Sequence, residues 1–354
     1  MTDYEAMCGN KIMVRMMSKV IGREEKQLKK FCKYINVFAE NIKSSPKSIK
    51  NKMKVTNSIN ASNRKGSLSV LPDDILEKIV NKYKTIFKIK YKLKDWIPPE
   101  KLDWCELSTN PNAIELLKAN QRNIDWDYLS ANPSQGAIEL LKENPYEEIN
   151  WTLLSENPYA IELLKAYPDE IDWNGLSKNA NTEAIELLKA HTDNINWDLL
   201  SLNTNTKAIE LLKANLDNID WNWLSINSNP EAIELLKANP EKIDWRYLSR
   251  NSNEGAIELL KANFEKIDWY ELSANTNPEA IELLKKNKKK INWSNLSENS
   301  NPEAIELLRT NPKKIEWPKL SANSAAIESL KANPENIDWY WLSENPAIFD
   351  EILE

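Results

Sequence analysis

Apolar and polar residues recur in one fixed order along most of this chain. Eleven segments read W-x-x-L-S-x-N, and successive tryptophans are 22 to 25 residues apart. Nearly every segment is followed by a second apolar stretch of the form A-I-E-L-L-K. The eleven tryptophans are Trp104, Trp126, Trp151, Trp173, Trp197, Trp221, Trp245, Trp269, Trp293, Trp317 and Trp339. A period of this length is typical of stacked repeats, in which each unit buries its apolar face against its neighbours.

Two adjoining units carry the signals of two short helices per repeat. Asp244 stands directly before Trp245, where an N-cap is favoured. Asn229 and Pro230 supply an N-cap and a proline at the first position of the A-I-E-L-L helix. Asn239 follows that helix, where a left-handed C-cap is expected. We therefore expect one helix to begin at each tryptophan and a second at each A-I-E-L-L stretch.

The spacing predicts an all-α fold, an α-solenoid of about eleven short two-helix repeats over residues 95–354. A leucine-rich repeat has a similar period and an L-x-x-N element, but W-x-x-L-S lacks its strand alternation. Residues 346–354 differ from the other units, and we expect them to form a C-terminal cap. With layers ~8–10 Å apart, the solenoid would be a rod on the order of 100 Å long. Its handedness and curvature stay open.

A basic helical region precedes the repeats. We expect residues 1–67 to form a basic arm with a helix near residues 24–43 and a flexible linker over 43–67, which is rich in Lys, Ser and Asn. Residues 68–94 are a helical segment that caps the first repeat or acts as an F-box-like element. Within it, residues 84–94 alternate lysine with apolar residues, which fits a short strand or the end of the helix. We expect the helix.

Charge divides the chain at the same boundary. Residues 1–94 contain 22 Lys and Arg against 8 Asp and Glu, whereas residues 95–354 contain 25 against 45. The acidic solenoid should repel nucleic acid, so only residues 1–94 could bind it, and only non-specifically. An anionic membrane or the solenoid itself are other possible partners of this basic region.

Composition also bears on location. The three cysteines are too widely spaced for a disulfide framework or a metal site, and no apolar run is long enough for a membrane span. We expect an intracellular, cytoplasmic protein.

Most repeated residues are expected to have structural roles. The tryptophans should form the core, because Trp and the Leu three residues later share one helix face. Asp and Asn exchange before the tryptophans, which favours helix caps over a ladder of cation ligands. The asparagine of L-S-x-N occurs in all eleven units, and either a left-handed helix end or a buried amide that bonds loop backbone would explain it.

The chain offers no candidate catalytic set. His191 is the only histidine, and it stands where a long helix should end, which predicts a surface residue. Phosphate-binding glycine loops are absent from the sequence. We expect a protein that is not an enzyme, with no cofactor, no metal and no small-molecule substrate.

The third position of each short helix, counting the tryptophan as the first, differs freely between units. Because core positions hardly vary, this position should lie at or near the surface. Five of its residues would then form an apolar stripe for binding a protein partner. They could instead pack partly between adjacent short helices. These candidate partner-binding residues are Tyr128, Leu153, Leu199, Trp223 and Tyr247.

The units N-P-x-A-I-E-L-L-K-x-N-P-x-x-I-D-W-x-x-L-S resemble tandem-repeat proteins encoded in many copies by giant DNA viruses of algae and amoebae. The resemblance covers roughly residues 91–354, including the lead-in YKLKDWIPPEKLDW. It implies a viral origin and little chemistry. One expectation is therefore an interaction scaffold, and the alternative is a structural protein, a minor capsid or virion-associated component that contacts capsid proteins in the host cytoplasm or the virion.

A second, shorter resemblance lies upstream, in the segment L-P-D-D-I-L-E-K-I of residues 71–79. It is similar to the first helix of an F-box, which docks on a Skp1-type adaptor of ubiquitin ligases. The match covers about ten residues, and the rest of an F-box does not fit before Trp96. If the segment works in this way, the docking residues are Leu71, Pro72, Ile75, Leu76 and Ile79.

Overall fold

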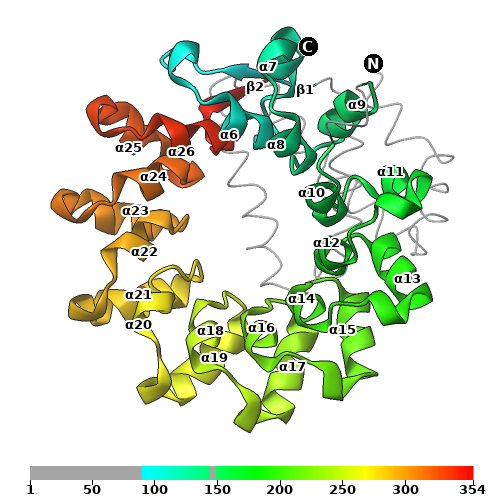
Figure 1. Cartoon of the computed structure of the whole chain (residues 1–354). Helices are drawn as coiled ribbons and strands as arrows, with labels where there is room; N and C mark the ends of the chain where they lie inside the picture. The colour runs from blue at the N-terminus through cyan, green and yellow to red at the C-terminus, as the bar shows by residue number, and fades with distance from the viewer. Residues whose placement is uncertain (1–88, 144–148, 354) are drawn as a thin grey trace, which may run out of the picture. The chain divides into compact units, whose positions relative to one another are not determined.

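A computed structural model describes residues 89–143 and 149–353 of the chain. Contacts divide the chain after Ile86 into two compact regions, and the described residues all belong to the second region. This region consists almost entirely of short helices, which confirms the all-α solenoid fold (Figure 1). The expected basic arm, the linker and residues 71–79 lie outside the described residues.

Each W-x-x-L-S segment is a short helix that begins at its tryptophan. These helices are α6 (Trp104–Thr109), α8 (Trp126–Ser130), α10 (Trp151–Glu156), α12 (Trp173–Lys178), α14 (Trp197–Leu202), α16 (Trp221–Ile226), α18 (Trp245–Arg250), α20 (Trp269–Leu272), α22 (Trp293–Glu298), α24 (Trp317–Ala322) and α26 (Trp339–Glu344).

The A-I-E-L-L stretches form a second set of helices, as predicted. They are α7 (Ile114–Ala119), α9 (Gln135–Glu143), α11 (Ile161–Ala166), α13 (Thr182–Ala190), α15 (Thr206–Lys213), α17 (Pro230–Ala238), α19 (Glu254–Ala262), α21 (Pro278–Lys286), α23 (Pro302–Arg309) and α25 (Ile327–Ala332).

Single 3-10 turns separate these elements and were not expected. They are η3 (Pro99–Lys101), η4 (Gln121–Asn123), η6 (Pro168–Glu170), η7 (Thr192–Asn194), η8 (Leu216–Asn218), η9 (Pro240–Lys242), η10 (Phe264–Lys266), η11 (Lys288–Lys290), η12 (Pro312–Lys314), η13 (Ser324–Ala326), η14 (Pro334–Asn336) and η15 (Pro346–Ile348). Two strands, β1 (Ile89–Leu93) and β2 (Phe349–Leu353), flank the repeats.

The core runs between the two sets of helices. In every unit the leucine of W-x-x-L-S is at most 1 % exposed, and the serine after it is fully buried. All eleven tryptophans are only partly buried and pack against this core from its margin. The leucines, rather than the tryptophans, are therefore the centre of the core.

Buried asparagine and serine side chains join each unit to the one before it. The amide of Asn251 donates to the carbonyl oxygens of Ser225 and Asn227, both at 2.9 Å. The Ser225 hydroxyl accepts from the Asp244 backbone N–H at 3.0 Å. Equivalent bonds recur along the array, so the asparagine of L-S-x-N is a buried amide that binds neighbouring backbone. Its backbone is extended rather than left-handed, with φ −71° at Asn251.

The last unit makes two of these contacts to the first. The Asp103 backbone N–H donates to the Ser343 hydroxyl at 2.9 Å, and the Asn110 amide donates to the Ser343 carbonyl at 3.0 Å. Lys101 stands 4.8 Å from the ring centre of Trp339, as Lys266 stands 4.5 Å from that of Trp245. The repeats therefore close into a ring of eleven units, and the expected open rod is wrong (Figure 1).

The two strands complete the eleventh unit. β1 and β2 pair antiparallel, with Tyr91 opposite Glu351. The Lys94 backbone N–H also donates to Ile348 O at 2.9 Å, and the Lys94 side chain pairs with Asp350. The helix expected over residues 84–94 is therefore wrong for residues 89–93, because the alternating lysines belong to a strand. Residues 346–353 close the ring, so they do not cap an open end.

The helices form two concentric layers. Figure 1 shows the short helices around the central opening and the A-I-E-L-L helices on the outside. Ion pairs such as Lys213–Glu231 and Lys285–Glu303 connect successive outer helices. The left-handed end expected at Asn239 is absent, since its φ is −132° and its amide donates to Leu235 O at 2.9 Å.

Candidate functional site

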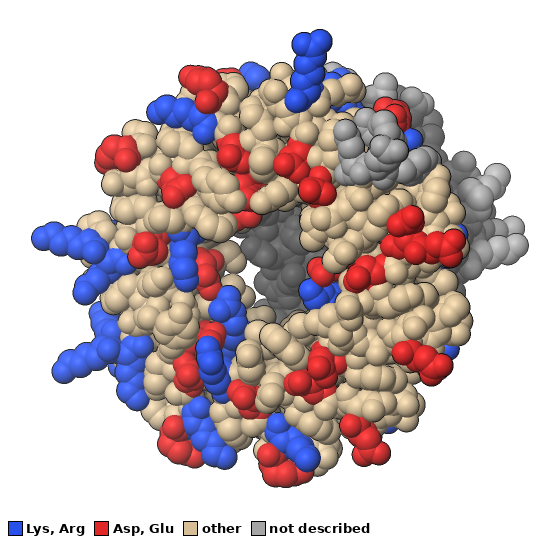
Figure 2. All heavy atoms as spheres, viewed as in Figure 1, with Lys and Arg blue, Asp and Glu red and all other residues tan. Residues whose placement is uncertain are grey.

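The short helices present their variable residues on the side away from the core. Positions one, four and five of each helix pack on the core, so positions two, three and six share the opposite face. We call these thirty-three positions together the inner face, because the short helices surround the central opening (Figure 1). Figure 2 shows this opening and charged side chains of both signs around it.

Helix caps fix the orientation of the inner face. The Asp244 carboxylate accepts from the backbone N–H of Tyr247 at 2.9 Å, and the Asn196 side chain does the same for Leu199 at 3.1 Å. Asp and Asn therefore act alike as N-caps, which confirms the predicted caps. Glu316 makes no cap bond. No group of His, Cys, Asp or Glu within residues 89–143 and 149–353 is arranged to hold a metal ion.

The five predicted partner-binding residues all lie on the inner face, but they are less exposed than expected. Tyr128 is 37 % exposed, and Leu153, Leu199, Trp223 and Tyr247 are half-buried. The rings of Trp223 and Tyr247 are in contact, with centroids 5.4 Å apart. These side chains therefore fill the spaces between adjacent short helices and expose one edge, which combines the two alternatives left open by the sequence.

Sequence reasoning missed the sixth position, which adds to this apolar surface. Leu202 and Ile226 occupy it in α14 and α16, and both are half-buried. The sequence does carry a signal for it, because the sixth position differs between units as the third does. We call the resulting patch the apolar arc; its residues are Leu199, Leu202, Trp223, Ile226 and Tyr247.

A charged segment of the inner face follows the apolar arc. Glu271, whose side chain is 8 % exposed, pairs with Arg246 at 3.1 Å and with Arg250 at 3.3 Å. Arg250 also pairs with Glu298 at 2.8 Å, which in turn is 3.1 Å from Lys319. The hydrogen bond from Arg246 to Glu271 raises the pKa of the Arg246 guanidinium, and the negative charge of Glu271 adds to this effect. These pairs join adjacent short helices and compensate the buried carboxylate.

His191 and Cys105, two further side chains with possible chemistry, lie in different units of the ring. His191 is exposed at the end of α13, as predicted, with its ring 4.9 Å from that of Trp173. Burial, followed by a hydrogen bond to Asp125, raises the pKa of the Cys105 thiol to about 11, so the thiol stays protonated at neutral pH. Among the described helices, none has the length and apolar character needed to cross a membrane.

Comparison with known proteins adds no further assignment. No family model, no curated protein and no solved structure matches this chain.

Proposed function

We propose that this protein is a non-enzymatic scaffold that binds a protein partner on its inner face. One observation supports this most directly: the inner-face positions differ from unit to unit, whereas the core and inter-unit residues repeat. Residues that only hold the ring together would have no reason to differ. The apolar arc is bordered by charged residues and contains two aromatic side chains, Trp223 and Tyr247, which is a composition typical of protein-binding surfaces.

The test compares inner-face and outer apolar residues in the full chain. Leu199→Ser, Trp223→Ser and Ile226→Ser together would disrupt the apolar arc. Leu216→Ser and Phe264→Ser form the matched control, because these side chains are 51 % and 44 % exposed on η8 and η10. Proximity crosslinking with mass spectrometry should identify partners that the inner-face variant loses and the control keeps. Equal capture by both variants, with circular dichroism showing both folded, would rule out the inner face.

A more specific role is that of a substrate adaptor, in which residues 71–79 of this chain would connect the ring and its bound partner to a ubiquitin ligase. Support for this role is the resemblance of L-P-D-D-I-L-E-K-I to the first helix of an F-box. Leu71→Ala and Ile75→Ala should then abolish co-purification of a Skp1-type adaptor without changing capture by the apolar arc. An intact interaction in the double variant would exclude this role.

The alternative is a structural role in the particle of a large DNA virus. It is supported by the resemblance of the repeats to proteins of giant DNA viruses. Quantitative mass spectrometry of purified particles should then find the chain at a fixed ratio to the capsid proteins. A ratio that falls with each purification step would favour the adaptor role.

A further inference from the structure

Two buried glutamates occupy the same position in different units. Glu106 and Glu271 are both the third residue of their short helix, and both are 6 % exposed. A buried carboxylate is costly unless a cation or several hydrogen bonds compensate it. We therefore compare the side chains of the preceding unit that lie beside each glutamate and could compensate its charge.

Glu271 receives two cations from the preceding unit. They are Arg246 and Arg250, at positions two and six of α18, with N–O distances of 3.1 and 3.3 Å. Around the ring, the unit preceding Glu106 is the last one, and the same positions of α26 hold Tyr340 and Glu344. The phenol of Tyr340 and the carboxylate of Glu344 thus lie beside Glu106 at the positions where two guanidinium groups lie beside Glu271.

This difference between the two units leaves excess negative charge at the junction of the first and last units. Tyr340 donates a hydrogen bond to Glu106, which raises the pKa of the phenol. Burial raises the pKa of the Glu344 carboxyl, and the negative charge of Glu106 raises it further. Glu106 therefore has a neutral donor, but neither carboxylate is paired with a cation by any salt bridge among the described residues.

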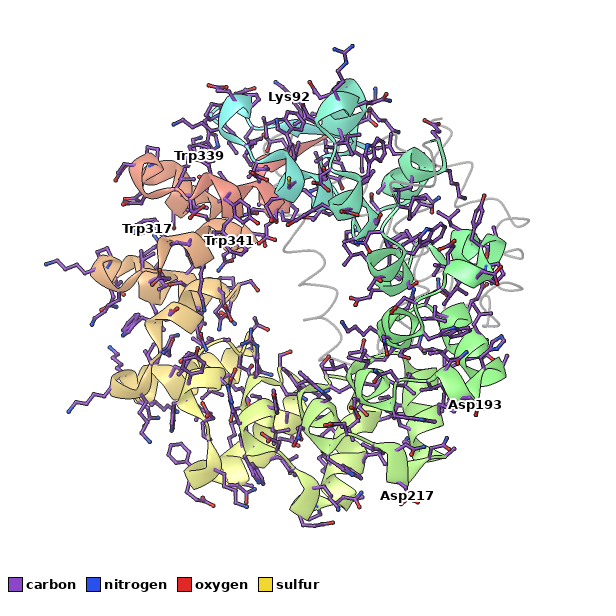
Figure 3. All side chains as sticks on the ribbon, in the orientation of Figure 1. Lys92, Asp193, Asp217, Trp317, Trp339 and Trp341 are labelled. Atoms are coloured by element: carbon purple, nitrogen blue, oxygen red, sulfur yellow. The ribbon has the colours of Figure 1, made fainter. Side chains whose placement is uncertain are left out.

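Two exposed aromatic rings stand beside these carboxylates. Tyr340 and Trp341 are 42 % and 41 % exposed, and their rings meet at 89° with centroids 5.2 Å apart. Figure 3 shows Trp341 nearer the central opening than Trp317 and Trp339. Spacings of three and four residues along α26 place both rings on the same side as Glu344. Perpendicular aromatic faces next to carboxylates attract a flat organic cation.

We propose that Glu106, Glu344, Tyr340 and Trp341 bind the guanidinium group of an arginine side chain on the partner protein. This inference rests on the proposed function and names the chemistry of one contact. Arginine fits better than lysine, because its planar fork can bond two carboxylates at once and stack on a ring. The ring itself provides the precedent, since Arg250 bridges Glu271 and Glu298. We call these four residues the seam site.

The test titrates the full chain with the tripeptide acetyl-Gly-Arg-Gly-amide. Matched tripeptides carry lysine or the neutral isostere citrulline in place of arginine. Nuclear magnetic resonance follows the indole N–H of Trp341, assigned with Trp341→Phe. Arginine should shift this signal saturably, lysine less strongly, and citrulline hardly at all. Equal shifts with arginine and citrulline would overturn the proposal, because charge would then play no part.

Variants locate the effect at the seam site. Glu344→Arg should supply the missing cation from within the chain, as Arg250 does for Glu271. It should raise the melting temperature and weaken binding of the arginine tripeptide at least about tenfold. Glu156→Gln is the control, because Glu156 occupies position six of α10 and pairs with Lys178 at 2.8 Å, away from the seam site. Unchanged tripeptide binding by Glu344→Arg would contradict the proposal.

The same variant separates this inference from the scaffold function. If Glu344→Arg keeps every crosslinked partner while the apolar-arc variant loses them, the scaffold stands and the seam site fails. If both variants lose the same partner, both proposals gain support. Tripeptide binding without any crosslinked partner would leave a guanidinium site but contradict its role in partner binding.

Discussion

At the scale of single residues, one buried asparagine per unit carries much of the connection between units. In the unit of Asn251, the amide donates to two carbonyls of the preceding unit, and the side-chain oxygen accepts from the Asn253 backbone N–H. Aspartate could not replace it, because a carboxylate cannot donate to those carbonyls. This explains why the asparagine of L-S-x-N is the same in all units. The residue before the tryptophan only accepts hydrogen bonds as a cap, so it can be either Asp or Asn.

Asn251→Ala should destabilise the protein by about 2–4 kcal/mol, because it leaves several buried backbone groups without partners. Asn239→Ala is the matched control. Asn239 is half-buried and donates a single bond to Leu235 O at 2.9 Å, so its loss should cost about 0.5–1 kcal/mol. Urea denaturation followed by circular dichroism measures both. Similar urea midpoints for the two variants would mean that the bonds of the buried asparagines are not a major source of stability.

A second prediction at this scale concerns pH. Burial and the charge of Glu106 raise the pKa of Glu344 above its ordinary value of 4.5, so ionised Glu344 opposes folding. Glu344→Gln should therefore raise the melting temperature at pH 7, and the gain should shrink as the pH falls through the raised pKa and protonates the parent. Thermal denaturation at pH 7 and pH 4 checks this.

Glu282→Gln should behave in the opposite way and serves as the control. Its hydrogen bond to Lys285, and then the charge of that lysine, lower the pKa of Glu282. The pair favours folding at pH 7, so the variant should melt slightly lower, and the difference should vanish as the pH falls through the lowered pKa. A gain from Glu344→Gln that is the same at both pH values would point to packing rather than charge.

The sequence allowed many of these residue roles to be predicted. Asp244 and Asn196 cap helices as expected, because a cap depends on its own helix. Asn251 stayed ambiguous, since its partners lie in another unit. The tryptophans were placed too deep in the core, because spacing along a helix identifies a face but gives no depth.

At the scale of secondary-structure elements, the strand pair is the exception to the repeat. β1 and β2 come from opposite ends of the array and take the place of an eleventh outer helix. The alternation in residues 84–94 was compatible with a strand, but a strand needs a partner, and β2 lies about 260 residues away. Periodicity in a short segment could not reveal that pairing.

Deletion of residues 349–354 should open the ring. It removes every backbone bond to β1 and the buried side chain of Phe349. Small-angle X-ray scattering should show a larger radius of gyration, because the strand pairing is lost and the junction keeps only the contact between α6 and α26 and a few bonds such as Lys94 N–H to Ile348 O. Ile352→Ser is the control, since this side chain is 40 % exposed and its backbone pairing is kept. An unchanged radius would show that the helices alone hold the junction.

At the scale of the whole molecule, the number of units matters because the array is closed. Eleven units share 360°, so each turns by about 33° relative to the last. Short helices inside and many longer ones outside favour this curvature. An open solenoid tolerates the loss of one unit, whereas a closed one must spread the missing angle over all the others.

Deletion of residues 245–268, one complete 24-residue unit, should therefore prevent strain-free closure. We expect a lower melting temperature and dimers in which the ends of two chains pair with each other. Light scattering after size-exclusion chromatography detects these dimers, and circular dichroism controls for intact helices. A monomer as stable as the parent would show that the angle between units adapts freely.

Ring closure could not be predicted from periodicity, which describes neighbours but not the total rotation. Ser343 has the same place in its unit as Ser225, whose hydroxyl accepts from the backbone N–H of the next unit. In the structure the Ser343 hydroxyl accepts from Asp103, the cap of the first unit.

Closure also shapes the order of folding. The Asp103–Ser343 bond joins residues 240 apart, whereas the equivalent bond between Asp244 and Ser225 spans 19. Contacts that span few residues form fast, so units should assemble into an arc before its ends meet. Because the arc already holds those ends near each other, the final step costs far less chain entropy than a loop of that length. The expected kinetic signature is a fast gain of helix followed by a slower, single event that protects the amide hydrogens of β1 and β2 from exchange.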